Sequence, residues 1–248
     1  MDGKKPGVLP NKDGGDLIYK IICMSRRQII FEDKQYYHVF NRGVDKKIIF
    51  HDEEDAKYFL DRLVDFNNSM PVGGVRNQEF KKYKKVRSPA SYLVEIVAYC
   101  VLPNHFHLLL KQVKDNGITK FMQRVCTGYA KYYNKKYERS GALFQGRFKA
   151  TELRGTGSLQ MLSVYVNLNY KHHSIDPNKN IVKSSLGEYL GKNLKYTICK
   201  EREINNIVGG TSEQDRQVYI SYSKMQSKYF TENKGRSIEN VDFKEFEK

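Results

Sequence analysis

The sequence has little cysteine, and its four cysteines follow no recognisable spacing. Cys23, Cys100, Cys126 and Cys199 lie far apart, without a CxxC pair or the spacing of a zinc finger. In a chain of 248 residues, this pattern favours reduced thiols over a disulfide framework. It argues against a disulfide-rich secreted protein and is typical of a protein of the cytoplasm.

Long apolar runs are absent as well. No stretch of 18 apolar residues occurs, so we expect no segment that spans a membrane. The apolar stretch near the N-terminus contains Lys20 and is followed by Arg26 and Arg27, which makes it a poor secretion signal. These observations predict a cytoplasmic protein without a membrane partner.

Acidic residues are scarce relative to basic ones. The chain has 28 Asp and Glu against 43 Lys and Arg, a formal net charge of +15. Such an excess favours a polyanionic partner, with nucleic acid ahead of an anionic membrane surface. An ordinary basic protein would show the same excess, so the charge alone does not decide the class.

The apolar pattern predicts one folded core with polar extensions. We expect a flexible N-terminal extension at residues 1–30, a core at 31–176, a C-terminal extension with short helices at 177–230 and a disordered tail at 231–248. Within the core, the patterns predict strands at 35–43, 91–103, 105–112 and 142–154, and helices at 52–68, 117–141 and 158–173. This order predicts an α+β sandwich of the RRM or ferredoxin-like type, with a mostly antiparallel sheet and helices packed on one face.

Two histidines are candidate metal ligands. His105 and His107 lie two apart in a predicted strand, so both imidazoles face one side while Phe106 faces the other. Two imidazoles at that spacing can share one divalent metal. By itself the pair is weak evidence, because histidines at such positions are more often structural.

The last predicted core helix carries a second pair, Tyr165 and Asn169. They are four residues apart and would share one helix face, roughly 6 Å apart along the axis. A helix packed on the sheet could aim both at the histidines, with Asn169 offering an amide oxygen and Tyr165 a phenolic oxygen. In isolation, such a pair more often means a core tyrosine beside a polar helix position.

Basic residues indicate where DNA could bind. One stripe along the helix at 117–141 consists of Lys120, Arg124, Lys131, Lys135 and Arg139. We expect this stripe to contact phosphates, with a solvated helix surface as the alternative, and Arg42 and Arg147 are further candidates. Residues 75–87 carry six Lys or Arg against one Glu, and the sequence leaves open a solvated loop or a DNA contact.

Several motifs occur together and carry a family resemblance. VLPNHFHLLL, GALFQGRF and YVNLN closely resemble, in that order, motifs of the HUH single-tyrosine transposases. YYHVFNRGVDKKIIFHDEED resembles the family's opening strand and first helix. KSSLGEYLG, at 183–191, resembles a segment of the REP-associated branch, which is related to the small transposases of insertion sequences. The resemblance covers residues 35–200 approximately.

The resemblance implies roles for the residues above. It makes His105 and His107 metal ligands, Tyr165 the nucleophile and Asn169 the third ligand, with Mg²⁺ or Mn²⁺ as the metal. The family commonly has Asn-Pro where this chain has Asn169-Tyr170, which puts the role of Asn169 in some question. His172 and His173 therefore stay open as substitute ligands.

The function implied is that of a transposase. It would be a metal-dependent endonuclease and strand transferase, acting on single-stranded DNA with a hairpin through a covalent phosphotyrosine, as a monomer or homodimer. One alternative is a non-catalytic protein that binds single-stranded nucleic acid on the same fold. The other is a nicking enzyme of the replication-initiator or relaxase type.

Overall fold

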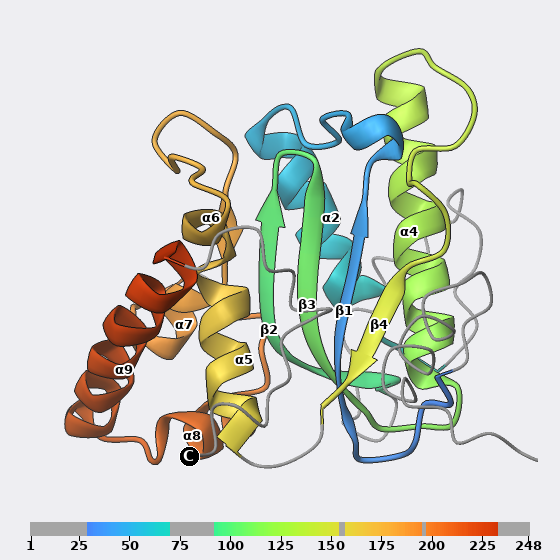
Figure 1. Cartoon of the computed structure of the whole chain (residues 1–248). Coiled ribbons are helices and arrows are strands. Elements are labelled where there is room, and N and C mark those ends of the chain that lie inside the picture. The colour runs from blue at the N-terminus through green and yellow to red at the C-terminus, as the bar shows by residue number, and fades with distance from the viewer. Residues whose placement is uncertain (1–28, 70–91, 154–156, 195–196, 233–248) are drawn as a thin grey trace, which may run out of the picture. The chain divides into compact units, whose positions relative to one another are not determined.

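The computed structural model describes residues 29–69, 92–153, 157–194 and 197–232 (Figure 1). From Phe31 onward these residues belong to one unit. The basic stretch at 75–87, residues 1–28 of the expected N-terminal extension and residues 233–248 of the expected tail lie outside the described residues.

Five strands form a single sheet in the order β4-β1-β3-β2-β5. Their bounds are β1 Tyr36–Arg42, β2 Val94–Leu102, β3 His105–Gln112, β4 Lys149–Glu152 and β5 Lys183–Ser184. All four neighbouring pairs are antiparallel. β2 and β3 form a hairpin that turns at Pro103 and Asn104, where the sequence has its turn signal. The predicted α+β class with a mostly antiparallel sheet is confirmed.

Two helices pack on one face of the sheet, α2 Glu53–Asp65 and α4 Gly117–Lys136. The Phe59 ring of α2 lies 4.8 Å from the ring of Phe106, whose side chain points to this face of β3. Acidic residues in its first turn and an Asp52 cap, which accepts from the Asp55 backbone N–H, explain where α2 begins.

The next helix, α5 Gly157–Asn167, lies on the opposite face and packs against β2 and β3. This corrects the expectation that helices cover one face only. The reason lies in the burial of α5: every residue from 161 to 167 is buried, including the polar Ser163 and Asn167. A helix that is buried all round needs cover on both sides. The sheet provides one side, and the later helices α8 Glu201–Val208 and α9 Glu213–Glu232 provide the other (Figure 1).

The predicted helix at 158–173 is interrupted. α5 ends at Asn167, Leu168 leaves helical backbone angles with φ −108° and ψ 16°, and the short helix α6 spans Asn169–His172. The predicted strand at 142–154 is likewise shorter, because only Lys149–Glu152 pairs as β4. Gly146, with a φ of +139° that side chains rarely adopt, breaks the strand before that point.

The C-terminal extension adds β5 to the sheet edge and three helices, α7 Leu186–Tyr189, α8 Glu201–Val208 and α9 Glu213–Glu232. α7 and α8 have 4 and 8 residues, whereas α9 has 20. A further short 3-10 turn, η1 Val44–Lys46, follows β1. The extension therefore packs on the core rather than standing apart from it.

A buried polar network joins α5 to the extension. The Tyr219 hydroxyl of α9 lies 3.0 Å from the Ser163 hydroxyl and accepts a hydrogen bond from Asn167 Nδ2 at 3.2 Å. The Ser185 hydroxyl donates to Asn167 Oδ1 at 2.6 Å and accepts from the Tyr99 backbone N–H at 3.0 Å. This network links α9, α5 and β2, and thereby sets the position of α5 on the sheet.

Tyr219→Phe should lower the free energy of unfolding by about 1–3 kcal/mol, because the Asn167 amide then stays buried without its acceptor. Urea unfolding of the two proteins measures this difference. Tyr222→Phe is the matched control on the same helix, since the Tyr222 hydroxyl forms no hydrogen bond within the described part of the chain. A loss for Tyr219→Phe of under about 0.5 kcal/mol, as for an ordinary surface change, would contradict a structural role of the network.

Candidate active site

A pocket of about 670 Å³ opens on the sheet face that α5 covers. Its lining comes from β1, β3, β4, α5 and the chain after α6. It contains seven residues singled out from the sequence: Arg42, His105, His107, Arg147, Tyr165, His172 and His173. The fold thus brings the histidine pair and the candidate nucleophile into one cavity.

In both His105 and His107, Nδ1 contacts a neighbouring side chain, and Nε2 forms no hydrogen bond within the described part of the chain. Both are buried, and their ring centroids are 5.1 Å apart. His105 Nδ1 lies 2.6 Å from the Asn104 side-chain oxygen, and its Nε2 has no hydrogen-bond partner among the described residues. His107 Nδ1 lies 2.8 Å from Nε2 of His38 on β1. Each histidine therefore keeps its Nε2 for a ligand in the pocket.

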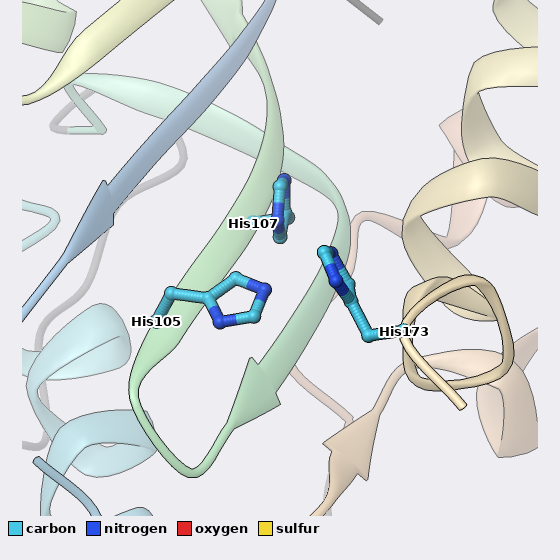
Figure 2. A group of neighbouring side chains, drawn as sticks. All are labelled: His105, His107 and His173. Carbon is cyan, nitrogen blue, oxygen red and sulfur yellow. The ribbon is translucent and has the colours of Figure 1, made fainter. Parts of the chain in front are cut away.

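His173 completes a group of three. One nitrogen from each of His105, His107 and His173 lies within 4.8 Å of the other two, and the three imidazoles converge on a common space (Figure 2). His173 is the C-terminal cap of α6 and is exposed. The sequence left this residue open as a substitute ligand, and the structure places it with the pair.

Asn169 lies at the start of α6 rather than on the face of α5 that carries Tyr165. Its side chain is completely buried, and neither Oδ1 nor Nδ2 has a hydrogen-bond partner in the described residues. The amide lies close enough to His105 to raise the pKa of its imidazole, against the larger lowering by burial. A buried amide without partners is costly in a protein interior. Together with the free Nε2 of His105, it fits a donor set for a cation.

Burial makes these imidazoles poor bases. Burial, the largest cause in both cases, lowers the pKa of His105 and of His38 to about 3. The pKa of His173, an exposed residue, falls to about 4, because partial desolvation of its ring and the nearby His172 and Arg42 disfavour the charged form. The pKa of His107 is also well below its usual value, because of burial and the neighbouring histidines. A neutral imidazole has one nitrogen with a free lone pair, and this neutral form is the one that binds a metal.

Tyr165 projects from α5 toward the histidines. Its ring is almost perpendicular to those of His38 and His107, with centroids 5.9 Å and 6.0 Å away, and the His172 ring is 5.5 Å away. His172, the other open substitute, therefore lies beside the tyrosine rather than in the group of three.

Two of the candidate DNA contacts border the pocket. Arg42 ends β1, and its guanidinium donates to the Gln145 side-chain oxygen at 3.2 Å. Arg147 also lines the pocket, together with Lys149 of β4, which the sequence analysis did not single out. This side of the pocket is cationic.

The basic stripe lies elsewhere. Lys120, Lys131 and Lys135 are exposed on α4, which covers the opposite sheet face. Arg124 donates to the Asn68 carbonyl oxygen instead of pointing into solvent. The stripe therefore cannot contact a phosphate bound in the pocket, because the sheet separates the two.

Besides Lys149, sequence reasoning missed His38 at the site. It is 2% exposed and lies edge to edge with His107, with ring centroids 5.0 Å apart and planes 8° apart. The signal was available, because the alternation of β1 places His38 on the same face as Arg42.

Comparison with known proteins gives a family match over part of the chain. Residues 75–169 match the family model described as "Transposase IS200 like". This segment contains the histidine pair, the GALFQGRF motif, Tyr165 and Asn169. Over these residues the chain is similar to IS200-like transposases, which agrees with the resemblance to insertion-sequence transposases. No curated protein is a significant match.

Two solved structures are similar to the chain. One is a REP-associated tyrosine transposase bound to a REP hairpin, with 15% identity, a TM-score of 0.46, and coverage of 71% of this chain and 91% of that chain. The other is tRNA(His) guanylyltransferase from Saccharomyces cerevisiae, with 11% identity, a TM-score of 0.33 and 82% coverage of both chains. These TM-scores are too low to support a functional assignment, which therefore depends on the family match and the site.

Every helix in the described ranges is too short or too polar to cross a lipid bilayer.

Proposed function

We propose that this chain, which is similar to IS200-like transposases over residues 75–169, is a metal-dependent transposase that nicks and rejoins single-stranded hairpin DNA through a covalent bond to Tyr165. The observation that carries the proposal is the meeting of Tyr165 with the nitrogens of His105, His107 and His173 in one pocket. These residues come from β3, α5 and the end of α6, so their convergence is a product of the fold.

The donor set suits a divalent cation. His105 and His107 would hold it through Nε2, with His173 and the Asn169 oxygen completing the set. When bound, the cation would withdraw negative charge from a phosphate oxygen and orient the phosphorus. Imidazole nitrogens suit Mn²⁺ better than Mg²⁺, which prefers oxygen ligands, so Mn²⁺ is the better candidate of the two.

Tyr165 would supply the nucleophile. A phenol has a pKa near 10, so its proton must leave, to a base or to water, as its oxygen attacks phosphorus. The new bond joins the 5′-phosphate to Tyr165, and the bond to the 3′-oxygen breaks, which releases a free 3′-hydroxyl. The product is still a phosphodiester, so another DNA 3′-hydroxyl can attack it and regenerate the tyrosine without ATP.

The cationic side of the pocket would hold the strand around the scissile phosphate, through Arg42, Arg147 and Lys149. Charge-assisted contacts from arginine suit phosphate oxygens. The exposed lysines of α4 would contact a different part of the DNA, because they lie on the far face of the sheet. A hairpin long enough to reach both faces would use both sets.

Two other functions are weaker. A protein that only binds single-stranded nucleic acid has no use for converging metal donors beside a tyrosine. A replication initiator or relaxase would use the same chemistry, but the match over residues 75–169 is to insertion-sequence transposases.

The test is a cleavage assay with Mn²⁺ and a labelled hairpin from palindromic repeats that flank the gene. A covalent protein–DNA adduct should form on single-stranded hairpin DNA, retain the label 3′ of the cut and disappear in EDTA. Hairpin affinity should fall with salt by about 0.7 log units per phosphate contact for each tenfold rise in salt. The control is a blunt duplex of the same sequence. Equal adduct on the duplex, or retention of the label 5′ of the cut, would refute the proposal.

A further inference from the structure

His38 contacts a candidate metal ligand directly. Its Nε2 lies 2.8 Å from Nδ1 of His107, and the two rings lie edge to edge with centroids 5.0 Å apart and planes 8° apart. At 2% exposure, His38 is shielded from water that could replace this contact. No second hydrogen-bond partner for His107 Nδ1 occurs in the described part of the chain. Which nitrogen of His107 carries the proton therefore depends on its hydrogen bond with His38.

Two neutral imidazoles can form this hydrogen bond in two ways. If His38 donates, His107 Nδ1 is the acceptor, and the His107 proton occupies Nε2, where it blocks a metal. If His107 donates from Nδ1, its Nε2 keeps a free lone pair. Only the second arrangement leaves His107 able to join His105 and His173 around a cation.

In His105, too, a hydrogen bond from Nδ1 leaves Nε2 free, but the partner is different. Its Nδ1 lies 2.6 Å from the side-chain oxygen of Asn104, which can only accept. His105 must therefore donate from Nδ1, and its Nε2 is left free. An outer hydrogen-bond acceptor that sets the tautomer and ring orientation of a metal-binding histidine is a general feature of metal sites.

We propose that His38 is the positioning residue for His107: by accepting a hydrogen bond from Nδ1, it holds the ring in the tautomer and orientation that bind the divalent cation. The inference rests on the proposed function and adds a residue to its metal site. His38 itself touches neither the metal nor the scissile phosphate. Its effect should appear first in metal affinity.

Two substitutions distinguish the role of the hydrogen-bond acceptor of His38 from that of its aromatic ring. His38→Phe keeps an aromatic ring against His107, Phe40 and Tyr165 but has no acceptor. His38→Gln loses the ring but can place an amide oxygen near the position of Nε2. Mn²⁺ affinity is measured on the full chain without DNA, from the electron paramagnetic resonance signal of free Mn²⁺. Melting temperatures show that each variant is folded, and His38→Leu replaces His38→Phe if that variant does not fold.

We expect His38→Phe to weaken Mn²⁺ binding by about 10- to 100-fold, as loss of such partners does at other metal sites, and His38→Gln to stay within about threefold. Phe40→Leu is the packing control: Phe40 stacks on both His38 and His107 but supplies no hydrogen bond, so its variant should bind Mn²⁺ within the same threefold range.

The outcomes distinguish this inference from the proposed function. If the unmodified protein binds Mn²⁺ and His107→Ala does not, but His38→Phe binds normally, the role of His38 is overturned and the metal site stands. Equal losses in His38→Phe and His38→Gln would also overturn it, because the shape of the ring would then matter rather than the acceptor. If the unmodified protein does not bind Mn²⁺, the metal-dependent function itself fails, and the role of His38 with it.

Discussion

Tyr165→Phe should abolish the covalent protein–DNA adduct and lower cleavage of the hairpin by about 10³-fold or more, because the substitution removes the attacking oxygen. The ring stays, so its packing against His38, His107 and His172 and the affinity for the hairpin should be retained. Denaturing electrophoresis with hairpin DNA labelled on either end, in Mn²⁺, measures the adduct. Binding is followed separately by gel shift.

Other tyrosines are competing nucleophiles, and the structure provides the control. Tyr129, Tyr132 and Tyr133 lie on α4, and Tyr137 is its C-terminal cap. None of the four is followed, four residues later, by a candidate ligand such as Asn169. Tyr132→Phe makes the same chemical change as Tyr165→Phe on the other face of the sheet, and it should leave the adduct intact. An adduct that persists in Tyr165→Phe, or that vanishes in Tyr132→Phe, would show that the nucleophile is misassigned.

His107→Ala should have the second large effect. We expect a loss of cleavage of about 10²-fold or more with hairpin affinity largely unchanged, because a ligand of the cation is removed and the cationic side of the pocket is not. Chelation of the metal by EDTA should reproduce this loss in the unmodified protein. Full cleavage in EDTA would exclude a role for the metal.

The third ligand is tested by a separate measurement of Mn²⁺ binding. His173→Ala should weaken Mn²⁺ binding at least as much as Asn169→Ala, since the His173 nitrogen lies within 4.8 Å of those of the other two histidines. Isothermal titration calorimetry with Mn²⁺ compares the two variants. A loss in Asn169→Ala alone would assign the third position to the amide and remove His173 from the site.

Local periodicity explains what could be predicted for the fold. Alternation within β3 puts His105 and His107 on one face and Phe106 on the other, whatever the rest of the chain does, because side chains alternate along every strand. Apolar spacing likewise located α2 and α4, and turn signals located the β2–β3 hairpin. These features depend only on residues that are close together in the sequence, so they can be predicted without knowledge of the fold.

The helix after β4 shows where local periodicity ends. Tyr165 and Asn169 were placed on one helix face, yet Leu168 breaks the helix between them. The nearly unbroken apolar run of α5 did not reveal which sheet face it covers, because an amphipathic stripe is what indicates direction. The stripe of α4 is predicted to contact phosphates, and its lysines are exposed, but their separation from the pocket depends on the layer in which α4 lies.

The sequence by itself determined the antiparallel α+β class, the paired histidines, the candidate nucleophile and the resemblance to a family, since each follows from spacing within one segment or from the order of motifs. Only the tertiary structure decided that His173 joins the pair and that His38 lies behind His107. His38, His107 and His173 are far apart along the chain and belong to β1, β3 and the end of α6. Their contact depends on the order of strands in the sheet and on the layer that α5 and α6 form over it, and these are properties of packing that no local pattern specifies.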